Sequence, residues 1–488
     1  MTSAAPTTAA AIARAVAAGT TSAAEVLAAS LHRIAALEPT LHAFVEVWAD
    51  RAQAAAGRID RDRAAGVPLG PLAGVPIAVK DNLVLAGEQA SAGSRMLAGY
   101  RSPFTATVLE RLEAAGAVLV GRTNMDEFGM GSTTETSAHG PTRNPFGNNL
   151  VPGGSSGGSA VAVAADYCPL AIGSDTGGSV RQPAALCGVS GLKPGWGRVS
   201  RSGLIAYASS LDCIGAMARS VEDLALWLDL AAGPDAADPT SGPAAPPVSA
   251  SLTTRGDLRG LRIGVPWELN GPGLDDDVAR CKDEALATAA SLGAEIVDCS
   301  LPAVAHAVAT YYLIATAEAA SNLARYDGVR YGLRRDGLGR LDVMTTRSRS
   351  AGFGDEVQLR ILLGTFASSH GWSEGFHDRA RALRAQLRAD FAQAFARCDL
   401  LLSPTSPVPA FPLGSSNDDP LTMYLCDALT VPASLAGLPA LSLPFGATTD
   451  GRPVGMQFTA AAQREDLLLQ VGHVLQRHTD HHLRRALP

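Results

Sequence analysis

The chain has 488 residues, a formal net charge of −7 at pH 7 and a sequence pI of about 5.8. This acidic balance argues against a dominant role in binding nucleic acid, because such proteins carry a basic surface. The length suffices for a large core and suggests two to four domains at about 150 residues each, although one α/β domain often exceeds that size.

The N-terminal half alternates helical and strand-like patterns. Ser22 and Glu25 form a capping box that opens an apolar-faced helix. A further helix is predicted at 105–115, and short apolar runs predict strands at 75–79, 117–121 and 168–172. This alternation predicts an α/β fold with a largely parallel sheet.

Lys80 closes the apolar run Gly-Val-Pro-Ile-Ala-Val that precedes it. A single lysine is usually a solvated surface charge. A lysine at the end of a buried strand is instead a candidate for burial, which would lower its pKa and leave the amine neutral enough to act as a base.

The stretch from Pro152 to Pro194 is dense in glycine and serine, yet it lies between well-patterned apolar segments. It includes Gly-Gly-Ser-Ser-Gly-Gly at 153–158 and Asp-Thr-Gly-Gly-Ser-Val-Arg at 175–181. Glycines on both sides of a serine allow close approach of a substrate and convergence of backbone N–H groups. An acyl-transfer enzyme needs this arrangement around a serine nucleophile.

Other motifs overlap this stretch, but their companion signals are missing. Ser155 fits the Gly-x-Ser-x-Gly elbow of α/β-hydrolases, but no downstream histidine lies in a comparable loop motif. Ser190 and Lys193 lack the Ser-Asp-Asn and Lys-Thr-Gly of penicillin-binding enzymes, and Asp175-Thr-Gly lacks the second copy that an aspartic protease needs. Ser159 stands where a phosphate loop requires lysine. A purely structural cluster of turns is the remaining alternative.

The second half begins with a Pro-, Ala-, Gly- and Asp-rich segment at 233–248, which predicts an exposed connector. Helices are predicted after it at 275–292, 303–330 and 373–397. Strands are predicted at 261–265, 295–297, 400–404 and 440–444.

The cysteine pattern indicates a cytoplasmic protein. The seven cysteines are odd in number, widely spread and without a Cys-x-x-Cys pair, so we expect reduced thiols. Neither a signal peptide nor a membrane-spanning helix is expected from the apolar runs. His478, His481 and His482 lack carboxylate or cysteine companions, so we expect a solvated helix end there and no metal site.

With Lys80, Gly-Gly-Ser-Ser-Gly-Gly and Asp-x-Gly-Gly-Ser-x-Arg in this order and spacing, the chain resembles the amidase signature family. The resemblance extends from about residue 8 to residue 478. It implies a single α/β/α domain, residues 1–488, with a large mixed, mostly parallel sheet covered by helices and with the 233–248 connector inside it.

The resemblance also implies catalytic roles. Ser179 would be the nucleophile, Lys80 the base and Ser155 the serine that bridges them, with a cis peptide bond beside it. The oxyanion hole would be formed by the backbone N–H groups of Thr176, Gly177, Gly178 and Ser179. A serine hydroxyl needs such a base before it can attack an amide carbonyl.

Segments outside the triad resemble one group within the family, the glutaminase subunits of tRNA-dependent amidotransferases. They lie at 121–132, 137–145, 197–200, 311–332, 353–357, 360–364 and 423–427. By this resemblance, Arg360 would bind the α-carboxylate of glutamine, Asp427 its α-ammonium, and Tyr311 would line the pocket. Buried structural ion pairs are the alternative interpretation of both charges. Trp196 and Trp372 depart from the pattern of this group.

These resemblances imply a working assembly. Two other subunits would complete a heterotrimer, ATP and Mg would bind at a partner, and misacylated tRNA would be held mainly by that partner. The chain itself would bind no cofactor. The acceptor would be Glu-tRNA(Gln), Asp-tRNA(Asn) or both. An independent amidase that acts on another amide is the alternative function, and a non-catalytic scaffold is a third that the intact triad disfavours.

Overall fold

The computed structural model describes residues 7–271, 273–369, 373–415 and 420–486. An eleven-stranded sheet runs through the molecule in the order β1-β3-β2-β4-β6-β5-β10-β11-β9-β7-β8. The strands are β1 (Phe44–Val47), β2 (Pro76–Lys80), β3 (Val118–Thr123), β4 (Leu170–Asp175), β5 (Ser190–Lys193), β6 (Cys213–Ala218), β7 (Arg262–Pro266), β8 (Glu295–Cys299), β9 (Leu400–Pro404), β10 (Ala440–Ala447) and β11 (Pro453–Ala460).

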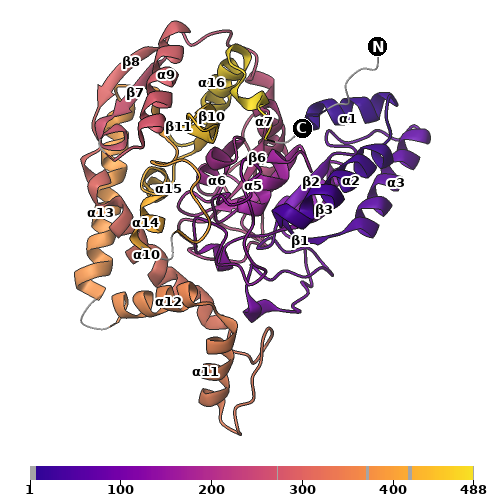
Figure 1. The fold of residues 1–488 in the computed structure, drawn as a ribbon, viewed down its shortest axis with the longest axis vertical. Coiled ribbons are helices and arrows are strands. Elements are labelled where there is room, and N and C mark those ends of the chain that lie inside the picture. The colour runs from indigo at the N-terminus through magenta and orange to yellow at the C-terminus, as the bar shows by residue number, and fades with distance from the viewer. Residues whose placement is uncertain (1–6, 272, 370–372, 416–419, 487–488) are drawn as a thin grey trace.

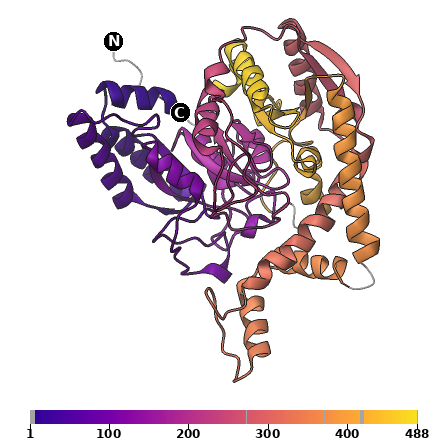
Figure 2. The ribbon, with the colours of Figure 1, turned by 180° about the vertical axis from the view of Figure 1, so that it is seen from behind.

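Helices cover this sheet, and Figure 1 shows α11 projecting from the rest of the molecule. The helices are α1 (Ala9–Ala18), α2 (Ala23–Leu41), α3 (Ala49–Ala64), α4 (Thr107–Ala114), α5 (Gly157–Ala164), α6 (Arg181–Leu186), α7 (Val221–Ala231), α8 (Trp267–Asn270), α9 (Asp276–Ser291), α10 (Ala307–Asn322), α11 (Leu341–Gly352), α12 (Asp355–Ala367), α13 (Ser373–Phe395), α14 (Pro420–Leu425), α15 (Val431–Ala436) and α16 (Glu465–His478). The view from behind shows α1 to α3 at one end of the sheet and α13 at the other (Figure 2).

The prediction of a mostly parallel sheet is wrong. Within the described residues, β2 pairs in parallel with β3 and β4, and β7 with β8 and β9, while the other six of the ten pairings are antiparallel. Parallel pairs need helical crossovers, which the alternating pattern reveals, whereas antiparallel neighbours need only a short turn. The antiparallel centre contains β5, β6 and β11, which lie in segments without a predicted strand.

Most predicted elements are confirmed within a few residues at their ends. Ser22 and Glu25 form the predicted capping box at the start of α2. The predicted helix at 303–330 is shorter in the structure, because α10 ends at Asn322 and only a single 3₁₀ turn follows it. The chain leaves helical geometry at Tyr326, whose φ of −89° and ψ of 83° directly follow that turn.

Two large hydrophobic clusters form the core. The larger one lies along the sheet between the N-terminal helices and α16, and the second lies among α10, α12, α13 and α15. The seven cysteines are buried and form no disulfide bond. Within the residues that the structure describes, no helix is long and apolar enough to cross a bilayer.

Candidate active site

Lys80 lies at the C-terminal end of β2 and is fully buried, as the sequence predicted. Because β2 and β4 are parallel neighbours, their C-terminal ends lie side by side. The Nζ atom of Lys80 therefore reaches three hydroxyl groups around that edge. In its charged form it donates to Ser155 Oγ at 2.8 Å, Ser156 Oγ at 2.7 Å and Ser174 Oγ at 3.0 Å.

Burial lowers the pKa of Lys80 from 10.5 to about 7, although the carboxylates of Asp126, Asp175 and Asp212 act in the opposite direction. Removal from water disfavours a charged amine, and the nearby negative charges offset only part of that cost. A substantial share of Lys80 is consequently neutral near pH 7. A neutral amine has a lone pair and can accept a proton.

Ser155 follows a cis peptide bond with Gly154, in agreement with the expectation from the family resemblance. Its carbonyl accepts from Asp126 N at 3.2 Å, and the Asp126 carboxylate accepts from Thr134 N at 2.9 Å and Thr136 Oγ1 at 2.9 Å. A Cβ atom on Gly154 would collide with Asp126 Oδ2, so only glycine fits at this position. Asp126 thus fixes the backbone that carries Ser155.

Ser179 lies in the turn between β4 and α6, and a buried ion pair holds this turn. Arg181 Nη2 is 2.9 Å from Asp175 Oδ1, and both side chains are fully buried. The other oxygen, Asp175 Oδ2, accepts from Val180 N at 3.1 Å. Although burial opposes it, the Arg181 guanidinium holds the pKa of Asp175 below its usual value. A hydrogen bond of 3.1 Å from Ser156 N to Ser179 O joins the two serine loops.

The turn before Ser179 presents free backbone donors. Among the described residues, no acceptor is found for the N–H groups of Thr176, Gly177, Gly178 and Ser179, or for the Ser179 hydroxyl. Thr176 Oγ1 donates to Asp212 Oδ1 at 2.7 Å, which orients the turn from its other side. Four N–H groups without partners among the described residues, all next to one serine, are the kind of donors that an oxyanion site requires.

Tyr311 and Asp427 lie directly against this turn. A Cβ atom on Gly177 would be 2.8 Å from Tyr311 Cζ, and one on Gly178 would be 3.0 Å from Asp427 Oδ1. Asp427 Oδ2 accepts from Ser132 Oγ at 2.5 Å, while the buried Oδ1 has no hydrogen-bond partner among the described residues. Burial raises the pKa of Asp427 to about 7. A ligand with a positive charge would satisfy this oxygen.

Arg360 projects from α12 and is buried. Its Nε is 2.7 Å from Glu356 Oε1, and its Nη1 donates to Tyr207 OH at 2.9 Å. Three rings surround the guanidinium, with centroids 5.1 to 5.8 Å away, from Tyr207, Tyr312 and Tyr424. Among the described residues, these contacts occupy two of its five N–H groups, so Arg360 retains donors for a further anion.

The structure therefore brings together the residues predicted at the triad, the oxyanion site and the amino-acid pocket. Sequence reasoning missed several groups that support them: Asp126, Ser132, Ser174, Tyr207, Asp212 and Thr430, whose carbonyl accepts from Arg181 Nη1 at 2.9 Å. Asp126 and Ser132 lie in the 121–132 segment, so the resemblance contained a signal for them.

Trp196 lies away from the triad, with its Nε1 3.3 Å from Ser209 O. Trp372 lies outside the described residues.

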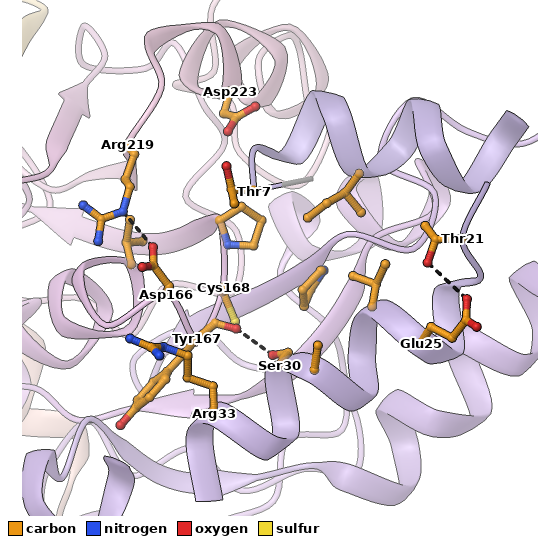
Figure 3. Close-up of a pocket in the computed structure, with 16 residues that line it drawn as sticks. Thr7, Thr21, Glu25, Ser30, Arg33, Asp166, Tyr167, Cys168, Arg219 and Asp223 are labelled. Carbon is orange, nitrogen blue, oxygen red and sulfur yellow. Dashed lines mark hydrogen bonds and ion pairs between the residues drawn. The ribbon is translucent and has the colours of Figure 1, made fainter. Parts of the chain in front are cut away.

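A separate cavity of about 280 Å³ lies between α1, α2 and the loop before β4 (Figure 3). Ser30 Oγ donates to Tyr167 O at 2.6 Å on one side, and Arg219 pairs with Asp166 at 2.8 Å on another. Asp223 accepts from Ala9 N and therefore caps α1. None of the triad residues lines this cavity, so we treat it as separate from the candidate active site.

Comparison with known proteins gives a family and a group within it. Residues 25–469 match the model of the family described as Amidase. The A subunit of glutamyl-tRNA(Gln) amidotransferase from Prochlorococcus marinus is 53% identical over 454 residues, which cover 93% of each chain. The corresponding protein of Chloroflexus aurantiacus is 52% identical over 471 residues, which cover 96% of each chain.

Solved structures show the same similarity. The A subunit of glutamyl-tRNA(Gln) amidotransferase from Thermotoga maritima shares 37% identity at a TM-score of 0.78, over 94% of this chain and 92% of that one. A 6-aminohexanoate cyclic dimer hydrolase shares 30% identity at a TM-score of 0.83, over 98% of both chains. The fold is therefore common to an amidotransferase component and to a hydrolase of a different amide.

Proposed function

The chain belongs to the amidase family, and from this premise we propose that it is the glutaminase subunit of a tRNA-dependent amidotransferase. It hydrolyses the side-chain amide of glutamine and supplies the ammonia that converts misacylated tRNA to its amidated form. Family membership and the similarity to the A subunits of glutamyl-tRNA(Gln) amidotransferases over almost the full length support this function.

The observation that carries the chemistry is the contact of 2.8 Å between Nζ of the fully buried Lys80 and Ser155 Oγ. The neutral amine takes a proton from Ser155, which takes the proton of the Ser179 hydroxyl. Ser179 Oγ then forms a bond to the amide carbon of glutamine. A serine hydroxyl is a weak nucleophile without such a base.

The N–H groups of residues 176–179 stabilise the oxyanion that forms in this step. One such donor typically contributes about 10²–10³-fold in rate. As the tetrahedral intermediate collapses, the C–N bond breaks and the proton held by Lys80 passes through Ser155 to the leaving nitrogen, which departs as ammonia. Water, activated by the same base, then attacks the Ser179 ester and releases glutamate.

We propose that the pocket beside the triad selects glutamine by its two charges. The unpartnered Asp427 Oδ1 lies against the Gly178 turn and would accept from the α-ammonium. Arg360 would bind the α-carboxylate with its remaining N–H groups, and the ring of Tyr311 against Gly177 would form a wall of the pocket. An opposite charge on each side fits a free amino acid and disfavours a simple amide.

The remaining machinery would lie on other chains. We propose a heterotrimer with two further subunits, one of which binds ATP, Mg and most of the misacylated tRNA. The acidic net charge and the lack of a Gly-Lys-Ser/Thr loop in the sequence support this division of labour. We also propose a cytoplasmic location and a single domain over residues 1–488, with 233–248 as an exposed connector within it.

Replacement of the nucleophile tests the proposal. Ser179→Ala should lower glutamine hydrolysis by about 10⁴-fold, because triad residues act as a unit. Ser190→Ala is the matched control, since Ser190 is also buried but its hydroxyl donates to Arg219 O, away from the triad. A folded Ser179→Ala variant that keeps more than about a tenth of the activity would exclude Ser179 as the nucleophile.

A further inference from the structure

Asn82 lies in the turn that follows β2, where Leu83 N donates to Lys80 O at 3.0 Å. The side chain is 4% exposed. Its Nδ2 donates to Ser174 Oγ at 2.9 Å, and the buried Oδ1 has no partner among the described residues. The hydrogen bond to Ser174 is consequently the contact that links the Asn82 side chain to Lys80, because Ser174 Oγ is itself 3.0 Å from Lys80 Nζ.

The hydrogen bonds around Lys80 limit how its amine can be oriented. A neutral amine has two N–H donors and one lone pair. Ser156 Oγ donates to Ser174 O at 3.1 Å, so toward Lys80 it is an acceptor. Ser174 Oγ accepts from Asn82 and likewise receives an N–H of Lys80. With both N–H groups occupied in this way, the lone pair is left for the Ser155 hydroxyl.

We propose that Asn82 is a positioning residue, which fixes the Ser174 hydroxyl as an acceptor and thereby directs the lone pair of Lys80 toward Ser155. The inference rests on the proposed role of Lys80 as the base. Among the described residues, the Asn82 side chain hydrogen-bonds to Ser174 alone, so its effect on Lys80 passes through Ser174. The other charged groups that act on Lys80 are the carboxylates of Asp126, Asp175 and Asp212.

A double-mutant cycle tests the route through Ser174. Asn82→Leu should lower kcat for glutamine hydrolysis by about tenfold, the loss expected for one hydrogen bond, with little change in KM. Ser174→Ala should have a similar effect, and the double variant should be no slower than Ser174→Ala alone. Full additivity of the two losses, or unchanged kcat in Asn82→Leu, would overturn the proposal.

A second experiment places a negative charge at position 82 and measures kcat/KM as a function of pH. In Asn82→Asp, a carboxylate accepts the Ser174 hydrogen and stabilises the charged form of Lys80. The acid limb of kcat/KM should therefore move up by about one pH unit or more. Asn270→Asp is the matched control, because Asn270 also donates through Nδ2 and has an unpartnered Oδ1, but lies in α8. Its acid limb should stay at the wild-type position.

The results separate this inference from the proposed function. If Lys80→Ala remains active, the proposed base itself is wrong. If Lys80→Ala is inactive but folded Asn82→Asp keeps the wild-type acid limb, only the role of Asn82 is overturned. If Asn82→Asp does not fold, as shown by circular dichroism, the cycle between Asn82→Leu and Ser174→Ala decides.

Discussion

Lys80 shows how one buried side chain sets the chemistry of the site. A solvated lysine is almost entirely protonated at pH 7 and cannot accept a proton. Complete burial at the end of β2 lowers its pKa to about 7, while three nearby carboxylates prevent a larger shift. The resulting balance leaves the amine partly neutral at physiological pH, as the proposed role of Lys80 as a base requires.

The pH dependence of catalysis should report this lysine. Since the neutral amine is the active form, kcat/KM should rise with pH through a pKa of about 7 and level off above it. Lys80→Ala should lose about 10³-fold or more in kcat, and Lys80→Arg should not restore activity because a guanidinium stays protonated. Steady-state rates between about pH 5 and pH 9 provide the measurement.

Lys282→Arg serves as the control for that series, because Lys282 pairs with Asp283 in α9 and is remote from the triad in the fold. An active Lys80→Arg enzyme would contradict the role of Lys80 as a general base. A wild-type profile without an acid limb near neutrality would contradict it as well.

Sequence patterns pointed to the proposed catalytic residues more readily than to the residues that support them. Lys80, Ser155 and Ser179 stand in motifs whose glycines and spacing carry information. Asp212 has no comparable motif, yet it accepts from Thr176 Oγ1 and holds the oxyanion turn. Its importance arises only when β6 pairs with β4 in the sheet, a contact that residue patterns along the chain do not encode.

At the scale of elements, the parallel pair β2 and β4 assembles the triad. The two strands end side by side, so the lysine after one and the serine turn after the other meet at a common edge. This pair was predictable because each strand is a short apolar run with a helix between. The antiparallel direction of the central strands was not predictable. β5 and β6 are fully buried and lack the alternation of apolar and polar residues that marks an antiparallel strand with one exposed face.

The proposed amino-acid pocket draws Tyr311 from α10, Arg360 from α12 and Asp427 from the turn that follows α14. Arg360 points inward from α12, so its loss should weaken binding of the substrate carboxylate more than the chemical step. Arg360→Ala should raise KM for glutamine by about a hundredfold or more, as expected when a desolvated charge pair is broken. Hydrolysis of a short uncharged amide by the same variant should change far less.

Arg219→Ala provides a matched loss of a buried arginine, because Arg219 pairs with Asp166 at the separate cavity. The Arg219→Ala variant should have a lower stability than the wild-type protein, while its KM for glutamine stays near the wild-type value. If Arg360→Ala reduces kcat/KM equally for glutamine and for the uncharged amide, Arg360 is a structural member of the Glu356 ion pair and does not select the substrate.

At the scale of the whole molecule, the chain carries the proposed amide-hydrolysing site but no sequence motif for ATP. Ammonia released at Ser179 would be lost to solvent unless a partner receives it. In many enzymes, closure of a site by a partner or second substrate completes the catalytic geometry. We expect such closure to bring the Ser179 hydroxyl into hydrogen-bond contact with Ser155, whose Oγ already lies 2.8 Å from Lys80 Nζ.

We therefore expect weak glutaminase activity from the isolated chain and a marked rise when the two partner subunits, misacylated tRNA and ATP are added. Glutamate release measured with each component omitted in turn would identify which one closes the site. The same mixture with Ser179→Ala should release no glutamate, but should still amidate the tRNA when free ammonia is supplied, because the partner's chemistry is intact. Equal glutamine turnover with and without the additions, together with failure to co-purify either partner, would instead identify an independent amidase.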